Sequence, residues 1–129
     1  MNGKPPELRR EHLRLVEVLT KAGLPRNPAR VIVFVAVAGR TYSAQIQAAT
    51  GLRQPEVSIA LRDLTDRRWV AKQTVQREGK GRPVNVYRLR KPVEEIAEWA
   101  EKELDRKARE LAKDREDLGH AASRLRPRE

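Results

Sequence analysis

Two strand-like runs separated by a short basic turn restrict the fold of this chain more than any other feature. The runs 69–75 and 83–89 are rich in β-branched and aromatic residues, which favour strands. The turn between them, 76–82, holds two glycines and three cationic side chains. Strands joined by a short glycine-containing turn form a hairpin, so the sequence predicts a hairpin with a basic tip over 76–83.

Two helices are predicted ahead of the hairpin. The first covers 7–22, where leucine and valine recur at helical spacing before a glycine. The second follows Asn27 and Pro28, which suit the N-cap and the first turn of a helix. Its apolar run, 31–38, would suit a buried strand by composition alone. The capping residues and the stop at Gly39 favour a buried helix instead.

A short strand, a short helix and a longer helix complete the part before the hairpin. Residues 40–42 suit a strand, and Ser43 suits the N-cap of a helix over 44–49. A tight turn then leads into a helix over 54–67. The apolar residues of this helix form one stripe, namely Val57, Leu61 and Leu64. Because their spacing places them on one face, that face is predicted to be buried.

The segment 92–125 forms a second unit. No helix-breaking residue interrupts 92–118, and opposite charges recur there at i,i+4 spacing, so a long helix is predicted. Apolar residues at spacings of three and four mark a coiled-coil seam for dimerisation: Ile96, Ala97, Ala100, Leu104, Ala108, Leu111 and Leu118. Trp99 lies off this seam and is predicted to pack as a core residue. The alternative is a helix that folds back on its own domain.

Positive charge is concentrated in the first two thirds of the 129-residue chain, whose net charge is +10. Residues 1–91 carry a net charge of +12, whereas residues 92–129 carry −2. A basic compact module suits a polyanionic partner such as nucleic acid. The sequence therefore predicts a nucleic-acid-binding domain over 1–91 and a different unit after it.

Composition disfavours several other classes of protein. The chain has no cysteine, which excludes disulfides and thiolate metal sites and suits a reducing cytoplasm. Its apolar runs are too short for a membrane span, and its N-terminus lacks the apolar core of a signal peptide. The sequence shows no catalytic triad, glycine-rich phosphate loop or metal-ligand spacing. We therefore expect neither an enzyme nor a cofactor or metal site.

The order of elements and the stretch 50–70 resemble the winged helix-turn-helix of the MarR, ArsR and archaeal TrmB-like transcriptional regulators. The residues that carry the resemblance are Thr50-Gly51-Leu52, Gln54-Pro55, Val57-Ser58, Leu61, Leu64 and Trp69-Val70. The hairpin sequence 79–89 resembles the wing of these proteins. The resemblance covers about residues 27–91. It implies a mainly α (α+β) fold, in which a DNA-binding winged helix-turn-helix domain precedes the long helix, and an archaeal or bacterial source.

Two positions depart from the pattern of these regulators. They usually have Ser or Asp where Arg53 stands, as the N-cap of the recognition helix, and an arginine side chain has no acceptor for that purpose. We expect Gln54 or the backbone to compensate. They usually have glycine where Arg68 stands. Either Arg68 adopts a strained left-handed conformation, or the helix ends in another way.

The helix 54–67 is predicted to enter the major groove, where its N-terminal residues can reach base edges. The outward residues of the helix and the cations of the wing form the predicted DNA-binding set: Arg53, Gln54, Pro55, Glu56, Ser58, Ile59, Arg62, Arg77, Lys80 and Arg82. Gln54 can pair with adenine, Arg62 with guanine or phosphate, and Glu56 with cytosine. The wing cations suit phosphates or the minor groove.

The predicted function is sequence-specific regulation of transcription by a homodimer at the nucleoid of a prokaryotic cytoplasm. Dimerisation would set two recognition helices about 34–36 Å apart, one for each half-site. Two alternatives stay open. One is an architectural or protein-interaction adaptor without sequence preference, and the other is an RNA-binding winged domain. The sequence does not identify a small-molecule effector, which would have to bind at the dimer seam.

Overall fold

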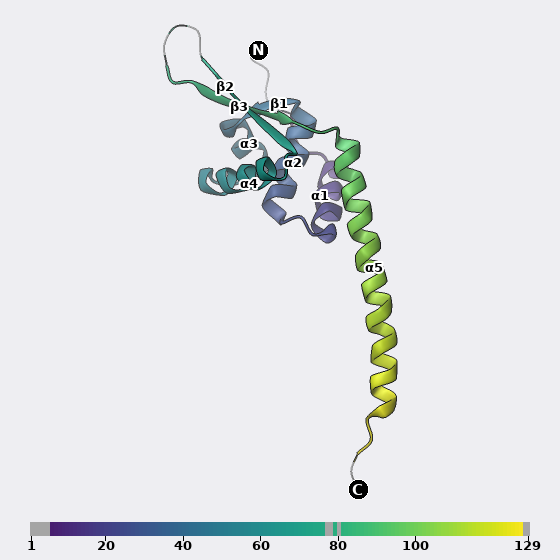
Figure 1. The fold of residues 1–129 in the computed structure, drawn as a ribbon. Helices are drawn as coiled ribbons and strands as arrows, with labels where there is room; N and C mark the ends of the chain where they lie inside the picture. The colour runs from purple at the N-terminus through teal and green to yellow at the C-terminus, as the bar shows by residue number, and fades with distance from the viewer. Residues whose placement is uncertain (1–5, 77–78, 80, 128–129) are drawn as a thin grey trace.

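A computed structural model describes residues 6–76, 79 and 81–127, which form a mainly helical fold with one small sheet (Figure 1). The elements follow in the order α1 (Arg10–Ala22), α2 (Arg26–Ala38), β1 (Arg40–Tyr42), α3 (Ser43–Thr50), α4 (Gln54–Asp66), β2 (Val70–Val75), β3 (Val84–Leu89) and α5 (Val93–Arg124). The predicted fold class and the predicted order of elements are confirmed.

The three strands form one antiparallel sheet in the order β1-β3-β2. β2 and β3 pair along Val70–Val75, which confirms the predicted hairpin. β1 pairs with the other edge of β3, where Thr41 lies opposite Tyr87. Because β1 leads directly into α3, this pairing ties the helices of the domain to the hairpin.

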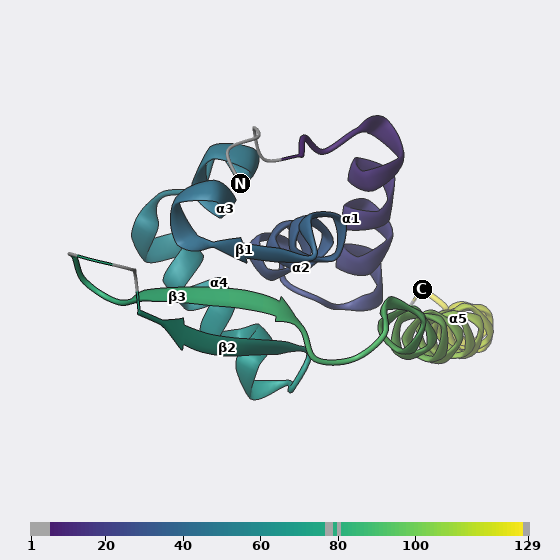
Figure 2. The same ribbon diagram turned by 90° about the horizontal axis from the view of Figure 1, so that it is seen from above.

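α2 lies at the centre of the core. The first five residues of its apolar run, 31–35, are all buried, with Phe34 fully enclosed, and residues 36–38 are half-buried. α1 and α4 both pack against α2, which Figure 2 shows among the other elements. A helix rich in valine is stable here because neighbours cover it on several sides, and this burial outweighs its modest helix propensity.

Three helix starts differ from those predicted from capping residues. α1 begins at Arg10 instead of residue 7. α2 begins at Arg26, so Asn27 lies within the first turn and is not the N-cap. α3 begins at Ser43 itself. The Ser43 hydroxyl donates a hydrogen bond to Gln54 Oε1 at 2.7 Å, so it faces α4 instead of capping its own helix.

α4 ends in a left-handed turn at Arg68. This is the one non-glycine residue of the described chain with a positive φ, at +64°. The Arg68 N–H donates to the carbonyl oxygen of Thr65 at 2.9 Å, and the Trp69 N–H donates to that of Leu64 at 3.0 Å. These two bonds form a Schellman motif, which glycine usually closes. Of the two outcomes considered from the sequence, the strained conformation is the one adopted.

α5 is a helix of 32 residues, about 48 Å long at 1.5 Å per residue. It passes the predicted end at residue 118 and continues to Arg124. Its first turns pack against α1, and its residues from Ala108 onward are exposed. Figure 1 shows this second half projecting beyond the domain. Among the described helices, none is both long and apolar enough to cross a membrane.

Candidate nucleic-acid interface

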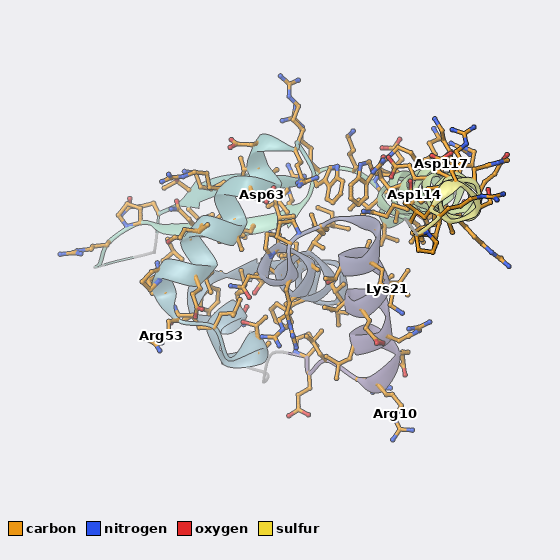
Figure 3. The ribbon with its side chains drawn as sticks, turned by 90° about the horizontal axis from the view of Figure 1, so that it is seen from below. Arg10, Lys21, Arg53, Asp63, Asp114 and Asp117 are labelled. Atoms are coloured by element: carbon orange, nitrogen blue, oxygen red, sulfur yellow. The ribbon has the colours of Figure 1, made fainter. Side chains whose placement is uncertain are left out.

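α3 and α4 form the helix-turn-helix, and the predicted division of α4 into two faces is confirmed. Val57 and Leu64 are fully buried and Leu61 nearly so, which holds α4 against the core. The residues predicted on the opposite face are all exposed: Arg53, Gln54, Pro55, Glu56, Ser58, Ile59 and Arg62. Figure 3 shows Arg53 on the side of the domain remote from α5. One face of α4 is therefore free to meet a ligand.

Gln54 belongs to a hydrogen-bond network that sequence reasoning missed. Its Oε1 accepts bonds from Ser43 Oγ at 2.7 Å and from Gln47 Nε2 at 2.9 Å. Its Nε2 donates to Ser58 Oγ at 3.2 Å. The two atoms that would pair with adenine are thus engaged, so base reading by Gln54 requires these bonds to exchange. The available signal was the i,i+4 spacing of Ser43 and Gln47, which places both on one face of α3.

Glu56 closes the start of α4. Its Oε1 accepts a hydrogen bond from the Arg53 N–H at 2.9 Å, as the acidic residue of a capping box does. The Arg53 side chain makes no capping bond. The expected compensation for Arg53 therefore comes from the Glu56 carboxylate and not from Gln54. One of the two oxygens proposed to read cytosine is occupied in this way.

Ile59 and Arg62 lie one turn further along the outward face. Ile59 is 69% exposed, which is unusual for so apolar a side chain. Arg62 is also exposed and lines a groove of about 300 Å³ between α4 and the sheet. An apolar group beside a cation suits the thymine methyl and the guanine acceptors of the major groove.

The groove beside Arg62 adds two residues that sequence reasoning missed. Lys72 of β2 and Tyr87 of β3 line its sheet side and lie opposite each other in the strand pairing. Burial raises the pKa of the Tyr87 phenol, although a hydrogen bond with Asn85 acts in the opposite direction. The phenol therefore stays protonated and can donate to an anion. Neither strand alternates strictly between exposed and covered residues, so strand periodicity did not single out these positions.

A further pair of cations lies on the sheet. Arg40 of β1 is directly opposite Arg88 of β3, and both are exposed. Like charges in this position repel each other. A bound polyanion would remove that repulsion, so the pair favours the same class of ligand as the outward face of α4.

The wing extends on the same side of the domain as α3 and α4, away from α5 (Figure 1). Arg82 is exposed just ahead of β3. Arg77 and Lys80, which were predicted to contact DNA with it, lie outside the described residues.

Arg67, Trp69 and Trp99 form a cluster that joins the end of α4 to α5. The two indole rings meet edge to face, with centroids 5.0 Å apart and an interplanar angle of 71°. The Arg67 guanidinium lies 5.3 Å from the Trp69 ring and 5.6 Å from the Trp99 ring. Asp63 holds it through an ion pair of 2.5 Å. The predicted packing role of Trp99 is confirmed, whereas the role of Arg67 was not foreseen.

The residues predicted to form the dimer seam divide into two groups. Ile96 and Ala100 are buried in the core of their own domain, so the prediction that they lie between two chains is wrong. α1 covers this part of α5, which is the fold-back arrangement considered as the alternative. Leu104 is half-buried against the same core. The remaining seam residues are exposed, namely Ala97, Ala108, Leu111 and Leu118.

An apolar cavity of about 150 Å³ lies where α1, α2 and the start of α5 meet. Its walls include Leu15, Ile32 and Ile96, and Glu94 is the one ionisable residue that lines it. Within the described residues, no group of three or more His, Asp or Glu side chains could hold a metal ion.

Comparisons with known proteins agree with this geometry. Residues 22–81 match the model of the MarR family. Among solved structures, the chain is similar to TrmBL2, an archaeal chromatin protein, with a TM-score of 0.56 and 21% identity over 88% of this chain and 41% of that one. It therefore spans about two fifths of the TrmBL2 chain. No curated protein matches it by sequence.

Two further structures are similar at low identity. BpsR of Bordetella bronchiseptica gives a TM-score of 0.50 and 21% identity over 76% of this chain and 74% of that one. NadR, solved in complex with 4-hydroxyphenylacetate, gives a TM-score of 0.51 and 18% identity over 98% and 99%. At such identities these likenesses show the fold alone.

An exposed outward face on α4, an antiparallel wing and a long C-terminal helix define the fold of winged-helix DNA-binding regulators. The part of the chain that matches the MarR family model, residues 22–81, runs from the end of α1 through the helix-turn-helix and β2.

Proposed function

We propose that the protein is a sequence-specific regulator of transcription that binds duplex DNA as a homodimer at the nucleoid. α4 enters the major groove, and the wing over 76–83 contacts the flanking backbone or the minor groove. The observation that carries the proposal is the outward face of α4, where Ile59 and Arg62 are exposed on a helix whose other face is held by the core. The net charge of +12 over residues 1–91 supplies attraction to any sequence.

The outward residues take different roles in this proposal. Arg62 reads guanine or contacts phosphate, and Ile59 contacts a thymine methyl. Arg53 and Arg82, with Arg77 and Lys80 of the wing, contact the backbone. Gln54 holds α4 against α3 in the free protein and exchanges its bonds when it reads adenine.

Dimerisation is supported by the exposed apolar face on the second half of α5. Leu111 is 68% exposed and Leu118 is 70% exposed, although leucine favours burial. A second copy that covered these side chains would bring a second α4 to the DNA, as regulators that read paired half-sites require.

An architectural role without sequence preference is the second candidate. Gln54 and one oxygen of Glu56 are engaged within the protein, which leaves fewer groups free to read bases. TrmBL2, which shares the fold, is described as a chromatin protein. This candidate predicts binding that depends on charge and DNA length, but not on sequence.

No carboxylate effector is proposed for the apolar cavity. The DNA binding of BpsR is regulated by 6-hydroxynicotinic acid, and NadR was solved with 4-hydroxyphenylacetate. Both compounds are carboxylic acids or their anions. The cavity of this chain has apolar walls and Glu94, which would repel such an anion.

Selection of bound sequences from random duplex DNA tests the proposal. It is run in parallel on the wild type, Arg62→Ala, Gln54→Ala and the control Lys113→Ala, which alters an exposed residue of α5. We expect a defined motif for the wild type and the control, and a changed base preference for at least one α4 variant, worth about 1–3 kcal/mol per contact. Absence of any motif would favour the architectural role. Tighter binding to duplex RNA than to duplex DNA would instead favour the RNA-binding alternative.

A further inference from the structure

Leucines recur at an interval of seven residues along α5 and at the C-cap residue that follows it. Leu104, Leu111, Leu118 and Leu125 follow this interval, and the last three are 68%, 70% and 79% exposed. An interval of seven keeps residues on one side of a helix and is the repeat of a coiled coil. By helical spacing, this side continues the one that carries Ile96 and Ala100.

α1 covers the same side of α5, but only along its first half. Ile96 and Ala100 are buried there, and Leu104 is half-buried. Gly23, the C-cap of α1, lies beside α5. A Cβ at Gly23 would be 3.9 Å from Lys107 Cε. Beyond Lys107 the leucine face has no neighbour among the described residues, as the projecting half of α5 in Figure 1 shows.

We propose that segment 108–125, which is the second half of α5 and its C-cap residue Leu125, pairs antiparallel with the same segment of a second copy. The inference rests on the proposed homodimer and specifies its geometry. A parallel partner would carry its own residues 93–107 along the side of α5 that α1 already occupies. An antiparallel partner runs in the opposite direction, so its residues 93–107 lie beyond the end of the first helix. The position of α1 thus excludes one orientation and permits the other.

Charge favours the same orientation. Segment 108–125 contains four Lys or Arg and four Asp or Glu, so pairing it with itself brings no net repulsion. The winged domains carry the excess positive charge, and an antiparallel pair keeps them at opposite ends. Arg115 lies on the seam three residues before Leu118. Parallel helices would set the two Arg115 side chains in one layer, whereas antiparallel helices set each against a leucine of the other.

Distances between spin labels distinguish the orientations. The chain has no cysteine, so single cysteines at Arg106, Lys113 and His120 can each be labelled without further changes. All three positions are exposed and seven residues apart. In an antiparallel dimer, two equivalent labels move apart along the helix axis by 1.5 Å on each helix for every residue between the label and the centre of the segment. The longest and the shortest of the three label separations therefore differ along the axis by about 20 Å. In a parallel dimer, the three separations are nearly equal.

The measurement is made by double electron–electron resonance on samples whose dimeric state is established by sedimentation velocity. A spread of separations with its minimum inside the segment supports the proposal. Equal separations overturn the antiparallel orientation but leave the homodimer intact. A dimer in which all three label separations are long also overturns the proposal, because its chains then associate through another surface. A monomer at all concentrations overturns both the orientation and the homodimer. Sequence-specific binding by such a monomer would leave only the DNA-reading part of the proposed function standing.

Discussion

Arg68 offers the clearest test of the local structure, because a single substitution should stabilise the protein. Its φ of +64° places an L-amino acid in the left-handed region, which costs about 1–2 kcal/mol. Glycine removes that strain, but its greater freedom in the unfolded chain costs about 0.5–1 kcal/mol. We expect Arg68→Gly to raise the free energy of unfolding by about 0.5–1 kcal/mol, which corresponds to about 2–4 °C in Tm for a chain of this size.

Urea denaturation followed by circular dichroism, at one fixed protein concentration, measures this change. Arg62→Gly is the matched control, because the same replacement within exposed α4 should destabilise the protein by about 1 kcal/mol. Opposite signs for the two variants would show that the conformation of position 68, and not the loss of an arginine charge, is responsible. If Arg68→Gly is as destabilising as the control, the left-handed turn at the end of α4 is refuted.

Three further predictions concern binding and assembly. Leu111→Glu combined with Leu118→Glu should give a folded monomer, since both side chains are exposed in the single chain. Sedimentation velocity measures the oligomeric state, and circular dichroism checks that the variant is folded. Lys113→Glu, a control on the same helix, should stay dimeric. Arg82→Ala should weaken binding to all DNA sequences alike and lower the salt dependence by about one ion per subunit; an unchanged salt dependence would mean that the wing points away from DNA. Replacing one thymine of the selected site by uracil should weaken wild-type binding about fourfold, the equivalent of one methyl group. Ile59→Ala should show no such loss, and equal losses in both proteins would exclude the methyl contact.

The faces of α4 and the hairpin could be predicted from the sequence because both depend on local spacing. Val57, Leu61 and Leu64 recur at intervals of four and three, and this alone decides which side of a helix is apolar. The hairpin follows from two strand-forming runs and a short glycine-containing turn. In both cases the residues that decide the structure are close neighbours in the chain.

The helix starts were predicted less well because a capping side chain can find a competing partner. Ser43 suits an N-cap by residue type, but its hydroxyl bonds to Gln54, eleven positions away. The bonds of Gln54 to Ser43 and Gln47 of α3, eleven and seven positions away, change the interpretation of this residue from a free base reader to a link between α3 and α4. Neither of these two partners can be inferred from residue type and spacing within one helix, whereas the bond to Ser58 lies within α4.

The sequence by itself determined that this chain is a basic module with one exposed recognition helix, followed by a long helix with an apolar side. Charge, residue type and periodicity are properties of the chain and survive any arrangement of its elements. Only the tertiary structure decided what covers each apolar side. Ile96 and Leu111 belong to the same side of α5, yet α1 buries the first and leaves the second exposed. The physical reason is that periodicity specifies which surface avoids water, whereas the length and position of a separate helix decide where that surface is already covered.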